Sequence, residues 1–333
     1  MLKIIALVGF ILISGAWSVL ALWVQNPLPA LTAYALPCLY ALMMVVAIGL
    51  AFRRFVLGLT IAGVAFLAVL IWYLNLTPKN DRQWNLEVAR QVDFVQNGTL
   101  IEVQNVRNFH WRSLDDYDVR WENRQYDLSK LDGVDLILST WGMDKIAHTL
   151  LSFRFSDGQK LALSIEIRKE QNEQYSAIAG FFRKYELAFI AADEKDIIYT
   201  RSNIRGDELI YLYPLNVSKQ FAQSLFLSYL QRGKALQSGP QWYNSLTSNC
   251  TTVIYDMVKQ IEPMPLDYRM IASGLLPEYL HKKGVIDPQY SLKDWQKMAL
   301  INPKTANFTT LSDQSSANFS AIIRTQNHEI NFK

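Results

Sequence analysis

Three long apolar runs at the start of the chain constrain its fold more than any other feature. They cover residues 4–24, 28–52 and 55–76 of a chain of 333 residues. Each run is long enough to cross the ~30 Å hydrocarbon core of a bilayer as a helix. The first run is long for the apolar part of a signal peptide, and two more follow at once, so we expect it to be retained. The sequence therefore predicts three transmembrane helices within residues 1–76.

Basic residues indicate the orientation of these helices. Residues 1–76 contain no Asp or Glu, and their only basic residues are Lys3, Arg53 and Arg54. Because basic residues beside a span tend to stay in the cytoplasm, everything after residue 76 should lie outside it. Together with the short loops, this predicts a multi-pass protein of the bacterial inner (cell) membrane with a periplasmic C-terminal domain. The lipid bilayer is its first expected partner.

The rest of the chain is predicted to be an α+β domain over residues 77–295 and a polar tail over 296–333. All 30 acidic residues follow residue 76 and are balanced by basic ones, so we expect no nucleic-acid partner. Hairpin signals mixed with helical patterns favour the α+β class. The tail is rich in Asn, Ser and Thr, so we expect it to be loosely held. We expect strands at 147–155, 159–168, 187–192, 197–201 and 208–213, a helix or lid at 174–186, and a helix at 218–234.

One of the two cysteines is a candidate nucleophile. Cys38 lies within the second span and Cys250 in the exported part, so the two do not pair. Apolar residues after Cys250 recur at helical spacing as far as Ile261, which predicts an amphipathic helix with Ser248 or Asn249 as its N-cap. A thiol in the first turn of a helix is favoured as the nucleophilic thiolate. The alternative is a small packed residue, which is the usual role of a free cysteine.

A predicted β-hairpin supplies the candidate base. Ser, Asp and Gly at 156–158 fit a three-residue loop with Gly at the left-handed position. Paired positions then sum to 314, which puts nearly all apolar side chains on one face. In this register His148 lies opposite Glu166, with Ser164 one diagonal away. A thiol nucleophile requires such an imidazole held by a carboxylate. A polar pair on a solvated face is the alternative.

Four segments carry a resemblance to a known family. The sequence resembles the periplasmic domain family named after the N-terminal part of Lnb, a lipoprotein intramolecular transacylase, over most of residues 80–290. The resemblance is carried by WGMDKIAHTLLSFRF, LALSIEIRKE, GFFRKYELAFI and NSLTSNCTTVIYDM. It implies a permuted NlpC- and papain-like thiol fold, in which an antiparallel sheet packs on the helix that bears the cysteine. It also implies Cys250 as the nucleophile and His148 as the base, whereas the choice of Glu166, with Ser164 in reserve, rests on the register.

The expected function is that of a thiol acyltransferase or hydrolase acting on lipoprotein or lipid-linked acyl groups. A peptidoglycan amidase or endopeptidase and a non-catalytic membrane-anchored module are the alternatives. Gly180, Phe181, Phe182 and Tyr185 are candidates for an apolar rim around an acyl chain, although we expect at least two of them to be ordinary core. No nucleotide loop, dinucleotide fingerprint or serine nucleophile elbow is present, so we expect no cofactor. One Cys and one His do not make a metal site.

Overall fold

The computed structural model describes residues 1–26, 33–308 and 316–325, and the chain forms two compact units. The first, here called the membrane unit, contains Met1–Lys79, Gln174–Glu186 and Trp242–Ser245. The second, called the globular unit, contains Asn80–Glu173, Leu187–Gln241 and Leu246–Lys333. The membrane unit thus includes two segments that lie far along the chain from its helices. The sequence pattern alone placed both segments in the exported domain.

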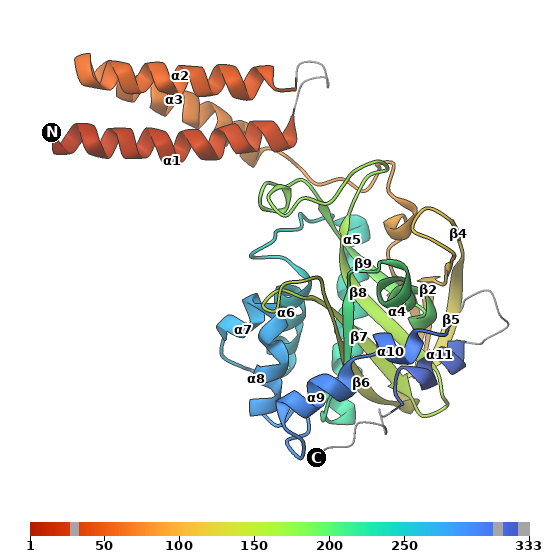
Figure 1. Ribbon diagram of the computed structural model, residues 1–333. Coiled ribbons are helices and arrows are strands. Elements are labelled where there is room, and N and C mark those ends of the chain that lie inside the picture. Colours follow the sequence, from red (N-terminus) through yellow and green to blue (C-terminus); the bar gives the residue numbers. More distant parts are fainter. Residues whose placement is uncertain (27–32, 309–315, 326–333) are drawn as a thin grey trace. The chain divides into compact units, whose positions relative to one another are not determined.

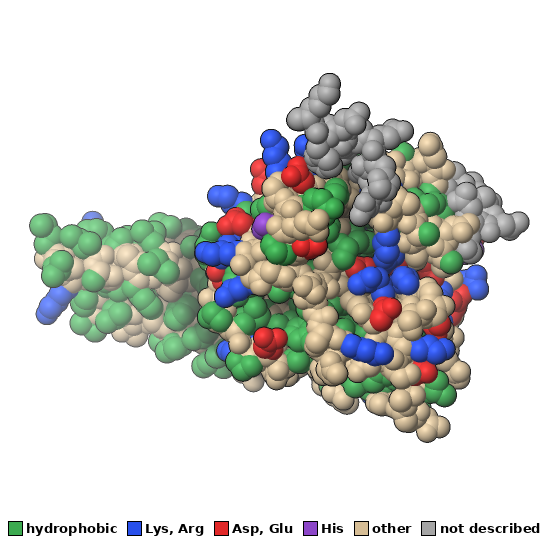
Figure 2. Space-filling view, turned by 90° about the horizontal axis from the view of Figure 1, so that it is seen from below, with side chains coloured by type: hydrophobic (Ala, Val, Ile, Leu, Met, Phe, Trp, Pro, Cys, Tyr) green, Lys and Arg blue, Asp and Glu red, His purple; other side chains and the backbone are tan. Residues whose placement is uncertain are grey.

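Three apolar helices make up most of the membrane unit: α1 (Leu2–Gln25), α2 (Ala35–Arg53) and α3 (Phe55–Leu74). All three are long and apolar enough to cross a membrane, which confirms the predicted spans. The second span was expected from residue 28, but residues 27–32 lie outside the described part. Gly58 lets α3 approach α2 closely, because a Cβ at this position would lie 2.8 Å from the backbone of Ala47 and Ala51. The helices present an almost wholly hydrophobic surface, whereas charged side chains are scattered over the rest (Figure 2).

A mixed eight-stranded sheet forms the centre of the globular unit (Figure 1). Along the sheet the strands follow the order β1-β2-β9-β8-β7-β6-β10, and β5 also pairs with β2. We expected an antiparallel sheet, but β9 pairs with β2 in parallel. The strands are β1 (Asp93–Asn97), β2 (Leu100–Arg107), β5 (Trp121–Asp127), β6 (Leu131–Thr140), β7 (His148–Phe155), β8 (Lys160–Arg168), β9 (Glu186–Ala192) and β10 (Leu209–Pro214), with a separate ribbon of β3 (His110–Trp111) and β4 (Tyr117–Asp118).

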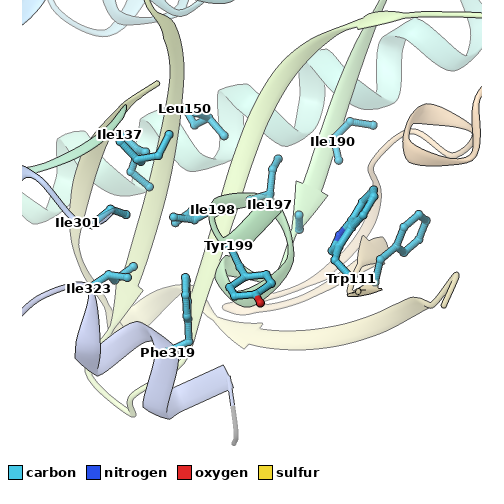
Figure 3. Packing of buried hydrophobic residues seen from close by; sticks show 14 of the residues in the cluster. Trp111, Ile137, Leu150, Ile190, Ile197, Ile198, Tyr199, Ile301, Phe319 and Ile323 are labelled. Carbon is cyan, nitrogen blue, oxygen red and sulfur yellow. The ribbon is translucent and has the colours of Figure 1, made fainter. Parts of the chain in front are cut away.

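Helices cover both faces of this sheet. On one face, α5 (Lys219–Ser238) places Phe226 against Phe153 and Phe155, with ring centroids 5.1 and 5.8 Å apart. The opposite face packs on a cluster that includes Ile198 and Phe319 (Figure 3). The remaining helices are α4 (Glu194–Tyr199), α6 (Cys250–Ile261), α7 (Tyr268–Ile271), α8 (Leu276–Lys282), α9 (Leu292–Ala299), α10 (Asn302–Thr305) and α11 (Ser316–Ile322). The α+β class is therefore confirmed.

The hairpin of β7 and β8 has the register that the sequence predicted. Leu150 lies opposite Ser164 and Phe153 opposite Leu161, so that paired positions sum to 314. Gly158 in the loop has a φ of +94°, where a residue with a side chain would be strained. The alternation of side chains and the loop glycine together fixed this register, because a slip by one residue would exchange the two faces.

Two expectations require correction. Residues 197–201 were predicted as a strand from their β-branched run, but they belong to α4 and to the π-helix η5 (Thr200–Ile204). The Asp193 side chain caps α4 by accepting a hydrogen bond from the Lys195 N–H, and this local bond outweighs the strand propensity.

The second correction concerns the tail, which was expected to be loosely held. Its described residues are packed instead, since Phe319 and Ile323 are fully buried. Arg324 donates to the carboxylates of Asp135 and Glu194, both of which lie in the interior. The polar composition concealed a few apolar residues at the spacing of one helical turn, and burying these was enough to anchor the segment.

Candidate active site

The first component of the site is the thiol of Cys250, the first residue of α6. Of the two candidate caps, the structure selects Asn249, whose side chain accepts hydrogen bonds from the N–H groups of Thr251 and Thr252. The Thr252 hydroxyl accepts in turn from the Asn249 N–H at 2.9 Å, which completes a capping box. The helix therefore begins firmly at the cysteine. Only 8% of Cys250 is exposed.

The second component is a polar row at the start of the hairpin. His148 Nε2 lies 2.9 Å from the Ser164 hydroxyl and 3.1 Å from Glu166 Oε1. The Ser164 hydroxyl itself donates to Glu166 at 2.6 Å. The side chains of His148 and Glu166 are only 15% and 17% exposed. The row is thus sheltered, unlike the solvated polar pair that was the alternative reading of this hairpin.

Cys250 and His148 are brought together by contacts between α6 and β7. A hydrogen bond of 2.9 Å joins the hydroxyls of Thr149 and Thr251. The Thr149 backbone and the His148 ring both act on the Cys250 sulfur and lower the pKa of the thiol. The four predicted site residues therefore form one connected set.

A fifth residue, Arg201, completes the row and was not found from the sequence. Its guanidinium donates to Glu166 Oε1 at 2.8 Å, and only 4% of the side chain is exposed. Glu208 lies on its other side at 4.0 Å. Arg201 belongs to η5, in the stretch predicted as a strand, and π-helical turns are frequent at functional sites. No pattern in the sequence links an arginine here to a hairpin more than thirty residues earlier.

The electrostatics of the site favour a thiolate beside an imidazolium. Burial alone would lower the pKa of His148, but the charges of Glu166 and Cys250 outweigh it and raise the pKa to about 9. Burial would raise the pKa of Cys250, yet the charge and hydrogen bond of His148 bring it below its ordinary value. The pKa of Glu166 is held well below its usual range, because His148 and Arg201 more than offset the effect of burial. The three groups therefore stabilise one another in their charged forms.

The four residues proposed as an apolar rim differ in exposure. Gly180, Phe182 and Tyr185 are buried, which confirms that at least two of the four are ordinary packing. Phe181, by contrast, is 48% exposed. In the described part of the chain, no group of three or more His, Cys, Asp and Glu side chains is arranged to hold a metal ion.

Three apolar helices joined to an α+β domain define a membrane protein with a large domain outside the bilayer. Residues 117–274 match the family model of the Lnb N-terminal periplasmic domain, which is the family that the sequence was expected to resemble. The protein is accordingly an inner-membrane protein with a periplasmic domain. Every residue of the candidate site falls within the matched range. No curated protein and no solved structure matches the chain.

Proposed function

We propose that this protein is a membrane-anchored periplasmic acyltransferase or hydrolase that uses Cys250 as nucleophile and His148 as general base. The observation that carries the proposal is the pairing of the Cys250 thiol with the His148 ring, in which each group shifts the pKa of the other while Glu166 holds Nε2 at 3.1 Å. Such a row of thiol, imidazole and carboxylate is the arrangement that activates a cysteine. Arg201 serves as a positioning residue, since it holds Glu166 in its charged form.

The chemistry begins with transfer of the thiol proton to His148. The thiolate attacks an ester carbonyl, a C–S bond forms, and the carbonyl oxygen becomes an oxyanion that accepts from the Cys250 N–H. When the C–O bond breaks, the leaving alkoxide takes the proton from His148 and departs as an alcohol, which leaves an acyl thioester. An amine or water then attacks the thioester and gives its proton to His148, and the thiolate departs. The product is an amide or a carboxylic acid.

The proposed substrates are the acyl groups of lipoproteins or lipids. The three spans tether the domain to a bilayer, whose lipids carry ester-linked acyl chains. The proposal also includes the permuted papain-like arrangement, since the strand with His148 precedes the helix with Cys250. Because the thiol is only 8% exposed, neighbouring side chains must give way before an acyl donor reaches it.

Mass spectrometry of the intact chain, purified from its own membrane, tests this proposal. We expect the wild type to carry a hydroxylamine-sensitive adduct on Cys250 with the mass of a fatty acyl group, and Cys250→Ala to lack it. Cys38→Ala is the matched control, because it removes the cysteine of the second span and should leave the adduct in place. A peptide adduct would instead indicate a peptidoglycan substrate. No adduct, combined with a thiol that reacts no faster than free cysteine, would refute a nucleophilic role.

A further inference from the structure

The segment Gln174–Glu186 is attached to the outer ends of the membrane helices, although it lies a hundred residues beyond them in the sequence. The Gln25 side chain, at the end of α1, donates to the carbonyls of Phe182 and Arg183 at 2.6 and 2.7 Å. Arg183 in turn donates to the carbonyl of Tyr73 at 2.8 Å and stacks on its ring at 4.8 Å. These contacts tie the segment to the ends of α1 and α3.

The depth of this attachment follows from the length of α1. Its 24 residues span about 36 Å, so a helix centred in the bilayer and perpendicular to it would extend about 3 Å beyond a ~30 Å hydrocarbon core at each end. Phe182 packs in a cluster with Ala21 and Tyr73, and Ala21 lies about 6 Å below Gln25 along the helix. In this placement of α1, Phe182 reaches the level where hydrocarbon gives way to headgroups.

Besides Tyr175, the same segment exposes two large apolar side chains, Ile178 and Phe181. Ile178 and Phe181 are 50% and 48% exposed, and the Phe181 N–H donates to the Ile178 carbonyl at 3.0 Å across the short helix η4 (Ala179–Phe181). A single turn thus carries both side chains. We expected a helix or lid over this whole stretch, but η4 is its only helix among the described residues, and β9 begins at its last residue.

Internal bonds hold the shape of the segment. The Tyr185 hydroxyl donates to the Gln174 carbonyl at 2.9 Å and accepts from the Ser176 N–H at 2.8 Å. The Ser245 N–H donates to the Gly180 carbonyl at 3.1 Å, and a Cβ on Gly180 would collide with the Ser245 side chain. The segment therefore presents Ile178 and Phe181 from a fixed scaffold, which reduces the ordering that binding requires.

We propose that Gln174–Glu186 is an interfacial loop that inserts Ile178 and Phe181 into the outer leaflet of the bilayer. We infer that lipid covers this apolar surface. Phe182 packs beside Ala21 and Tyr73 at the ends of the membrane helices, and the Cα of Phe181 is only ~3.8 Å further along the chain. Aromatic and aliphatic side chains with Arg nearby are typical of such interfacial anchors. The proposal makes no use of the thiol and stands independently of the proposed function.

The test uses the full-length chain in phospholipid nanodiscs. With Cys38 and Cys250 replaced by Ser, a single cysteine is placed by Ile178→Cys, by Phe181→Cys or, as a control, by Val95→Cys, and is labelled with a small fluorophore. Val95 is a matched control because it is an apolar residue of the globular unit that is 55% exposed. Each label is then quenched by a lipid that carries a spin label near its headgroup, and separately by aqueous iodide.

We expect the labels at 178 and 181 to be quenched by the spin-labelled lipid and to be about threefold less sensitive to iodide than the label at 95. Labels that iodide quenches as readily as the control would overturn the proposal. Labels that neither iodide nor the spin-labelled lipid quenches would also overturn the proposal, because a protein surface would then cover the loop. A second test uses the unsubstituted chain and a lipid that carries a photoreactive diazirine. Crosslinked adducts on Ile178 and Phe181 would support insertion into the bilayer, and their absence would overturn it.

Discussion

Replacing Glu166 by Gln separates the charge of this residue from its hydrogen bonds. The amide keeps an oxygen that accepts from His148, Ser164 and Arg201, so the contacts of the row survive. The negative charge 3.1 Å from His148 Nε2 is lost. Burial then acts on His148 with only Cys250 left to oppose it, and the pKa of His148 falls.

The magnitude follows from the pKa of His148 in the wild type. A rise from 6.5 to about 9 corresponds to about 3 kcal/mol, at about 1.4 kcal/mol for each pH unit. Because the pKa is raised on folding, this stabilisation is complete below pH 6.5 and is lost as the pH rises through about 9. We therefore expect Glu166→Gln to cost about 3 kcal/mol more near pH 6 than in alkaline solution, where His148 is neutral and only the ion pair of Glu166 with Arg201 is lost.

The thiol should respond in the same experiment. With less charge on His148, the pKa of Cys250 rises, because His148 provides the main influence that lowers it against burial. We expect alkylation by iodoacetamide at neutral pH to slow by about tenfold for each unit by which the pKa rises. The assay compares rate against pH for the full chain in nanodiscs, in a Cys38→Ser background. Thermal unfolding followed by fluorescence at acid and alkaline pH reports the stability.

Glu194→Gln is the matched control for this variant. Glu194 is also buried, but it pairs with Arg324 and Ser152, away from the thiol. It should lower the stability and leave the alkylation curve unchanged. A wild-type curve for Glu166→Gln, or an equal shift in both variants, would show that Glu166 has no specific influence on the thiol.

Three further predictions concern packing and backbone. Phe319→Ala should cost about 3–5 kcal/mol, because a fully buried ring leaves a cavity, and a normal melting temperature would show that the tail is dispensable. Asn249→Ala removes the N-cap of α6, so the free energy of unfolding should fall by about 1 kcal/mol and alkylation of Cys250 should slow. An unchanged alkylation rate would mean that the cap has no influence on the thiol. Gly158→Ala would place its Cβ in open space but would force a residue with a side chain to a φ of +94°. We expect the free energy of unfolding to fall by about 1–2 kcal/mol in thermal unfolding, and an unchanged value would argue against this loop conformation.

The sequence determined those features that depend on local spacing. Hydropathy alone located the three spans, because a bilayer requires an uninterrupted apolar run. Alternation of side chains and one loop glycine determined the register of β7 and β8, and with it the approach of His148, Ser164 and Glu166. The helix that begins at Cys250 was likewise visible from its periodicity and its cap.

Only the tertiary structure decided the contacts between distant segments. Arg201 reaches Glu166 because α4 and η5 fold back over the sheet, and neither the helical state of 197–201 nor this contact leaves a periodic signal. The packing of Phe319 and the attachment of Gln174–Glu186 to the membrane helices are of the same kind. Their physical reason is burial: which apolar and charged groups satisfy one another depends on the assembled surface, whereas periodicity records only which face of an element is apolar.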